Sequence, residues 1–208
     1  MTTKLSAPIL VCGLTRCGSS LMMKMLDVAG VPVFADNQSA YESDLLSMDR
    51  NMAKMLPRLW GKAAKVLDPH RPDCFADWPN PCDARVIWMD RNHIQQAKSQ
   101  IKFMRLVGGF QIPSQAWRRV ADSLYPDTAL CLKEMAARGV SIERVTFEGL
   151  LQYPLETSIR IADFLGMSLD VDRMAAAVID RPVKCAPDLA IEHAAMMADA
   201  PSGTGGKE

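Results

Sequence analysis

The sequence predicts an α/β fold in which a mostly parallel sheet lies between two layers of helices. Two observations support this: continuous apolar runs of strand length, and amphipathic segments of helix length that alternate with them along the chain. An apolar run without polar alternation is typical of a strand buried on both faces. The 208 residues are enough for one core, so we expect one domain over residues 1–200 and a small polar tail over residues 201–208.

The expected elements follow one another in a regular order. The expected strands are residues 9–12, 31–34, 86–89 and 144–147. The expected helices are residues 21–29, 45–56, 92–107, a region at 114–138 that Pro126 interrupts, and 155–165, which Gly166 ends. Residues 57–83 contain five prolines and are predicted to form a long irregular loop.

Composition narrows the class of protein. The chain has 24 Lys and Arg against 24 Asp and Glu, which argues against a nucleic-acid partner and against an acidic disordered chain. Six cysteines without a CxxC pair indicate free thiols in a reducing compartment, so a cytoplasmic location is expected. No stretch reaches the ~20 apolar residues that a membrane span needs. Any anion-binding site must therefore be local.

A glycine loop follows the first expected strand. Residues 13–20 read GLTRCGSS, with the spacing G-x-x-x-x-G-S-S. The N–H groups at the start of a helix and the helix dipole favour an anion there. A nucleotide-triphosphate loop would carry Lys where Ser19 stands, whereas the cation here is Arg16. The loop predicts a site for a phosphate-like or sulfate-like group without magnesium, and a plain glycine turn with a helix cap is the alternative. The binding candidates are Gly13, Thr15, Arg16, Cys17, Gly18, Ser19 and Ser20.

Positive charge gathers in a second segment. Residues 85–105 contain five cations and a single acid, Asp90. Arg91 is expected just past the carboxyl end of a strand, where open α/β sheets bind their ligands. Ser99 lies about two turns into the following helix. The other cations after Arg91 (Lys98, Lys102 and Arg105) have helical spacing and are interpreted as an exposed basic face.

Three segments together resemble the cytosolic-type sulfotransferases, which use 3′-phosphoadenosine 5′-phosphosulfate (PAPS) as donor. ILVCGLTRCGSSLMMKML resembles the family's 5′-phosphosulfate loop. RVIWMDRNHIQQAKSQIKF resembles its 3′-phosphate motif, in which a Ser follows an Arg by eight residues. RVTFEGLLQYPLETSIRIADFLGM is similar to a third family stretch. The three segments occur in the family's order and cover roughly a third of the chain.

The resemblance implies a P-loop-type fold and an enzyme that transfers a sulfuryl group to a hydroxyl of a small molecule, carbohydrate or lipid. It also implies that the chain is a short, bacterial-type member of the family and that the reaction needs no metal. It assigns the 5′-phosphosulfate to the loop with Arg16, the 3′-phosphate to Arg91 and Ser99, and a place near adenine to Phe147. The acceptor is left open, and so is the oligomeric state, with a homodimer as one option.

The chain also departs from the family pattern. Thr15 replaces a Pro, Cys17 a Ser, His93 a Pro and Phe147 a Tyr. These departures motivate a second hypothesis, a nucleotide-binding or assembly protein that kept the fold and lost transfer activity. A P-loop kinase is disfavoured by Ser19 at the Lys position.

The general base is the least defined part of the predicted site. By the resemblance it is expected after the first helix, where the chain reads DNQSAYESDLL. Glu42 is the first choice, with Asp36 and His70 behind it. A helix N-terminal carboxylate is the alternative role for Glu42. His70 with Cys74 and Cys82 is a weak match to zinc ligands, and no metal site is expected.

Overall fold

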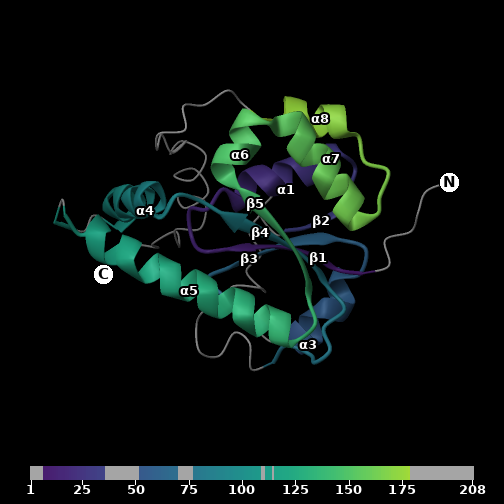
Figure 1. Cartoon of the computed structure of the whole chain (residues 1–208), viewed down its shortest axis with the longest axis horizontal. Helices are drawn as coiled ribbons and strands as arrows, with labels where there is room; N and C mark the ends of the chain where they lie inside the picture. Colours follow the sequence, from purple (N-terminus) through teal and green to yellow (C-terminus); the bar gives the residue numbers. More distant parts are fainter. Residues whose placement is uncertain (1–6, 36–51, 70–76, 109–110, 114, 179–208) are drawn as a thin grey trace, which may run out of the picture.

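The protein is built around a parallel five-stranded sheet. The computed structural model describes residues 7–35, 52–69, 77–108, 111–113 and 115–178 (Figure 1). The strands are β1 (Ile9–Gly13), β2 (Val33–Phe34), β3 (Ala63–Leu67), β4 (Arg85–Asp90) and β5 (Ser141–Thr146). They lie in the order β2-β3-β1-β4-β5, and all neighbours are parallel. The predicted fold class is confirmed.

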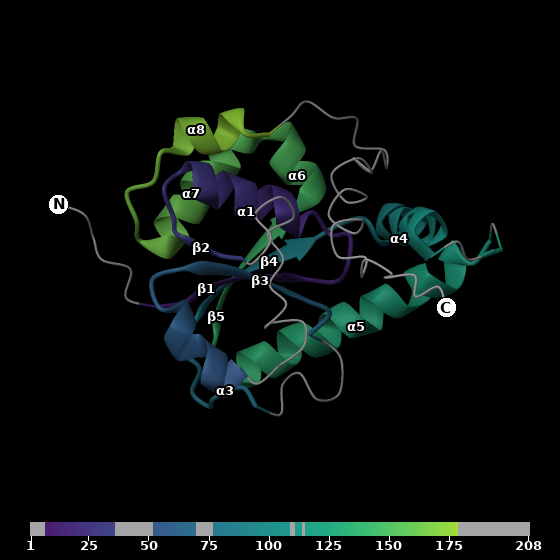
Figure 2. The ribbon, with the colours of Figure 1, turned by 180° about the vertical axis from the view of Figure 1, so that it is seen from behind.

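Helices cover both faces of this sheet (Figures 1 and 2). The helices are α1 (Ser19–Val28), α3 (Met52–Met55), the 3₁₀ turn η1 (Leu56–Leu59), α4 (His93–Gly108), α5 (Trp117–Ala137), α6 (Phe147–Gln152), α7 (Pro154–Leu165) and α8 (Val171–Ala176). Helices α1, α6, α7 and α8 pack on one face, and α3, η1 and α5 on the other. No helix within the described ranges is long and apolar enough to cross a membrane.

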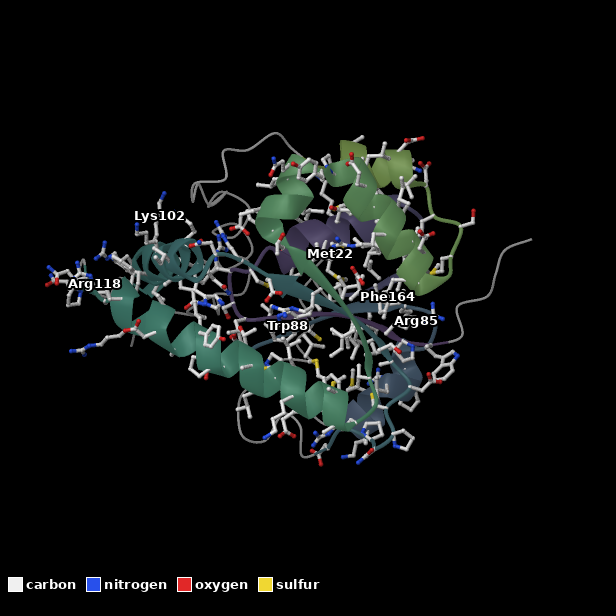
Figure 3. The ribbon with its side chains drawn as sticks, viewed as in Figure 1. Met22, Arg85, Trp88, Lys102, Arg118 and Phe164 are labelled. Carbon is white, nitrogen blue, oxygen red and sulfur yellow. The ribbon has the colours of Figure 1, made fainter. Side chains whose placement is uncertain are left out.

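The two faces of the central strands form two separate cores. Leu10 of β1 and Trp88 of β4 point toward α5, whereas Val11 and Ile87 point toward α1. Figure 3 shows Met22 of α1 and Trp88 on opposite sides of the sheet. Because both faces are covered, the central strands are apolar throughout, which is why the sequence revealed them.

The prediction for residues 57–83 was wrong. They contain η1 and the buried strand β3, which pairs with β1 and β2. The run AAKVL escaped notice because Ala has low strand propensity and a Lys interrupts the apolar pattern. Pro126 also does not interrupt its helix, because it lies inside the continuous α5.

Several sequence predictions lie outside the described residues. Of the expected helix at residues 45–56, the structure describes α3 and the first residue of η1. The polar tail at 201–208, and with it the predicted end of the domain, is also outside the described part of the chain.

Candidate functional site

The carboxyl ends of β1 and β4 form the switch point of the sheet. From β1 the chain passes through α1 to β2 on one side, and from β4 through α4 and α5 to β5 on the other. Open α/β sheets bind ligands in the crevice at such a point. Gly13 at the end of β1 pairs with Met89 of β4. The loops that carry Arg16 and Arg91 therefore leave the sheet next to each other.

Close packing and unusual backbone angles determine the path of the glycine loop. A Cβ atom on Gly13 would lie 2.8 Å from the Met89 carbonyl oxygen. Gly18 has a φ of 104°, and a Cβ atom there would overlap the Phe147 ring. Arg16 has a φ of 70°, which is uncommon for a residue other than glycine. Such strain persists only where neighbouring contacts hold it, and it clusters at functional loops.

The carbonyl oxygens of this loop are held by hydrogen bonds within the protein. These hydrogen bonds hold the carbonyl oxygens, which would repel an anion, on one side of the loop. In a trans peptide the N–H points away from the carbonyl oxygen, so the N–H groups that follow these carbonyls face the other side. The Gly13 carbonyl accepts from Asp68 N at 3.0 Å, and the Arg16 carbonyl accepts from Arg91 Nη1 at 3.0 Å. The Leu14 carbonyl accepts from Cys17 N at 3.1 Å and from Gln96 Nε2 at 2.9 Å. The Thr15 carbonyl accepts from Gln96 Nε2 at 3.0 Å and from Gln100 Nε2 at 2.7 Å.

Two guanidinium groups flank the loop. Arg16 Nε donates to Ser99 Oγ at 3.2 Å, and its guanidinium carbon lies 5.1 Å from the Phe103 ring centroid. The Arg91 guanidinium carbon lies 4.6 Å from the centroid of the Phe147 ring, a cation–π distance. Ser99 is fully buried. The structure thus brings together Arg16, Arg91, Ser99 and Phe147, which the sequence had singled out in three distant segments.

Two charged residues in and just after β3 also belong to this site, and the sequence interpretation missed both. Lys65 is buried, and its Nζ donates to Ser20 Oγ at 3.1 Å. Asp68 accepts the Thr15 N–H at 2.7 Å and also the Thr15 hydroxyl. The sequence did contain a signal for this strand: a short apolar run that carries these two charges and lies between Gly61 and Pro69.

The loop thiol is not an ionised group. Burial raises the pKa of Cys17 to about 11, and hydrogen bonds with the backbone and side chain of Ser19 offset only part of that rise. The neighbouring Ser19 is also buried. The positive character of the site therefore comes from the loop amides, the start of α1 and the basic side chains.

The structure does not test the predicted base. Glu42, Asp36 and His70 all lie outside the described residues. Other carboxylates near the switch point have structural partners: Asp90 accepts from Arg144 at 2.8 Å, and Glu148 accepts the Asn92 N–H at 3.1 Å. His93 packs edge-on against Tyr125, with 6.0 Å between ring centroids.

Solved sulfotransferases share this fold. The sulfotransferase domain from the curacin biosynthetic pathway matches with a TM-score of 0.56 and 12% identity, covering 91% of this chain and 83% of that one. The sulfotransferase from Alicyclobacillus acidocaldarius matches with a TM-score of 0.53 and 14% identity, covering 92% and 91%. Mouse sulfotransferase SULT7A1 complexed with PAP matches with a TM-score of 0.56 and 14% identity, covering 82% and 61%.

No protein-family model and no curated protein sequence matches the chain. The structural matches nevertheless agree with the resemblance found in the three sequence segments, and the protein has a sulfotransferase fold. At 12–14% identity the likeness establishes the fold. The activity has to be argued from the residues of the site.

Proposed function

We propose that the protein is a sulfotransferase that uses PAPS as donor and a hydroxyl group of a small molecule, carbohydrate or lipid as acceptor. The main supporting observation is that Arg16 and Arg91 meet at the switch point, from the ends of two neighbouring strands. Two permanently charged, forked donors suit a ligand with two separate anionic groups. PAPS has such groups at its 5′ and 3′ positions. The PAP complex of the mouse neighbour supports the same ligand class.

The residues present fit this donor. The loop directs the Leu14 and Thr15 carbonyl oxygens to glutamine side chains of α4, and the amides from Gly18 onward at the start of the ten-residue helix α1 would hold the 5′-phosphosulfate together with Arg16. Buried Lys65 beside Ser20 adds positive charge on that side. Arg91 and Ser99 would hold the 3′-phosphate. The Phe147 ring, between Gly18 and Arg91, offers an apolar wall for adenine.

The chemistry is an in-line transfer. The acceptor oxygen forms a bond to sulfur as the bond between sulfur and the donor's phosphate oxygen breaks, and the acceptor proton passes to a base. Negative charge that develops on the leaving 3′,5′-ADP would be stabilised by Arg16 and the loop amides. We retain Glu42 as the proposed base, with Asp36 and His70 as the next choices.

Titration calorimetry with the spent donor 3′,5′-ADP tests this function. We expect a Kd of order 1 μM, about −8 kcal/mol, for the wild type. Arg16→Ala and Arg91→Ala should each weaken binding by at least ~10-fold, because a charge-assisted hydrogen bond contributes ~1.5–3 kcal/mol. Arg173→Ala, on the exposed side of α8, is the matched control and should bind normally. Equal affinity in all four proteins would exclude the proposed site.

A second candidate function is nucleotide binding without transfer. It is favoured by Cys17, whose buried neutral thiol stands where relatives carry a Ser hydroxyl. Sulfate transfer from PAPS to a broad acceptor panel separates the two functions. Turnover that is lost in Glu42→Gln while 3′,5′-ADP binding stays intact supports transfer with Glu42 as base. Normal donor binding with no turnover on any acceptor supports the second function.

A further inference from the structure

A cationic surface extends from the candidate site across α4 to α5. Residues 91–121 contain six cations and no acid, in a chain whose charges balance to zero. Arg91 belongs to the site, and the other five are exposed. These five residues form what we call the α4–α5 cationic surface: Lys98, Lys102, Arg105, Arg118 and Arg119.

Contacts of Arg16 with α4 connect this surface to the site. Arg16 contacts Ser99 and Phe103 of α4, and the exposed Lys98 and Lys102 directly precede these two residues in the chain. Lys98 Nζ also lies 4.9 Å from the centroid of the Trp117 ring at the start of α5.

The same Trp117 ring links the two helices. The Arg118 guanidinium carbon lies 5.6 Å from the ring centroid. Figure 3 shows Lys102 and Arg118 at the same end of the molecule. Lys98 of α4 and Arg118 of α5 therefore meet at one ring, and α4 is the helix that Arg16 contacts.

Some cations elsewhere in the described chain have carboxylate or carbonyl partners. Arg144 pairs with Asp90 at 2.8 Å, and Arg160 pairs with Glu143 at 2.6 Å. Arg85 donates to the Phe164 and Leu165 carbonyls at the end of α7, on the other side of the molecule from Lys102 (Figure 3). Within the residues that the structure describes, no carboxylate pairs with the five cations of the α4–α5 surface.

We propose that the α4–α5 cationic surface captures the nucleotide donor electrostatically and guides it to Arg16 and Arg91. This inference rests on the proposed function and adds a kinetic role for residues outside the site. Each phosphate of the spent donor 3′,5′-ADP is a monoester that carries about −1.5 to −2 charges near neutral pH, so this ligand is strongly attracted. Exposed charges at the rim of a site act mainly on the association rate constant.

Stopped-flow measurement of 3′,5′-ADP binding tests the proposal. The surface variant is Lys102→Gln/Arg118→Gln/Arg119→Gln, which leaves the Lys98 and Arg105 contacts in place. The matched control is Lys54→Gln/Arg58→Gln/Arg173→Gln, which removes the same charge from exposed positions on α3, η1 and α8. Figure 1 shows α3 at the other end of α5 from α4.

We expect the surface variant to associate roughly 3- to 10-fold more slowly than the control at low salt, with an unchanged dissociation rate. The difference should vanish near 1 M salt, where the Debye length is about 3 Å. It should also be smaller for 5′-AMP, which has one phosphate fewer. Equal association rates in the two variants, or a change confined to dissociation, would overturn the capture role. Failure of the wild type to bind 3′,5′-ADP would instead refute the proposed function.

Discussion

Cys17 lies within the anion loop but is a poor nucleophile. Its side chain is completely buried, and burial raises the pKa of its thiol to about 11. At neutral pH only about one molecule in 10⁴ would carry the thiolate, the reactive form. Its neighbours in the core are apolar residues of α1 and β4. The residue therefore contributes packing beneath the loop rather than chemistry.

The raised pKa predicts a specific dependence of stability on pH. The unfolded thiol ionises near its ordinary value of 9.0 and the folded thiol near about 11. Ionisation therefore favours the unfolded state, and the stability present below pH 9 is progressively lost as the pH rises toward 11. Urea unfolding from pH 8 to 11 should show a shallower decline in Cys17→Ser than in the wild type. Parallel curves for the two proteins would contradict the assignment.

The unequal success of strand prediction has a physical cause. β1 and β4 were predicted because a continuous run of apolar residues fills both faces of each strand. β3 is equally buried, but two alanines and Lys65 occupy its first three positions. The burial of Lys65 follows from the tertiary structure, since Lys65 pairs with Val11 of β1 and contacts Ser20 of α1. A local pattern does not contain that information.

Asp68, just after β3, forms hydrogen bonds with the glycine loop, which predicts that it positions this loop for ligand binding. The carboxylate of Asp68 holds both the N–H and the hydroxyl of Thr15. Asp68→Ala should weaken 3′,5′-ADP binding by about 10-fold, because hydrogen bonds to a charged group contribute ~1.5–3 kcal/mol. Asp68→Asn keeps one acceptor oxygen and tolerates the positive φ of 50°, so it should lose less.

Asp163→Ala, an exposed change on α7, is the control for these two variants. Titration calorimetry gives the affinity of each protein. Wild-type affinity in Asp68→Ala would contradict a positioning role. If both Asp68 variants bound normally but lost transfer, Asp68 would act as a base instead.

At the scale of the whole molecule, the candidate site is an assembly of four strand ends, those of β1, β3, β4 and β5. The parts after β1 and β4 could be predicted because each has a local signature, a glycine loop or an Arg and Ser eight residues apart. The part from β3 has no such signature. Its contact between Thr15 and Asp68 spans 53 residues and arises only when the parallel sheet forms. The juxtaposition of the segments after β1 and β4 could therefore be predicted, and their support from β3 could not.

A ligand that bridges strand ends should stabilise the whole fold. At 100 times its Kd, 3′,5′-ADP should add about 2.7 kcal/mol to the free energy of unfolding, and for a domain of this size roughly 5–10 °C to the Tm. The shift should persist in EDTA, because guanidinium groups rather than a metal neutralise the phosphates. The double variant Arg16→Ala/Arg91→Ala should lose the shift, and Arg173→Ala should keep it. Calorimetric scans measure both. A shift that requires magnesium, or one that Mg-ATP reproduces in full, would instead indicate a nucleotide-triphosphate site.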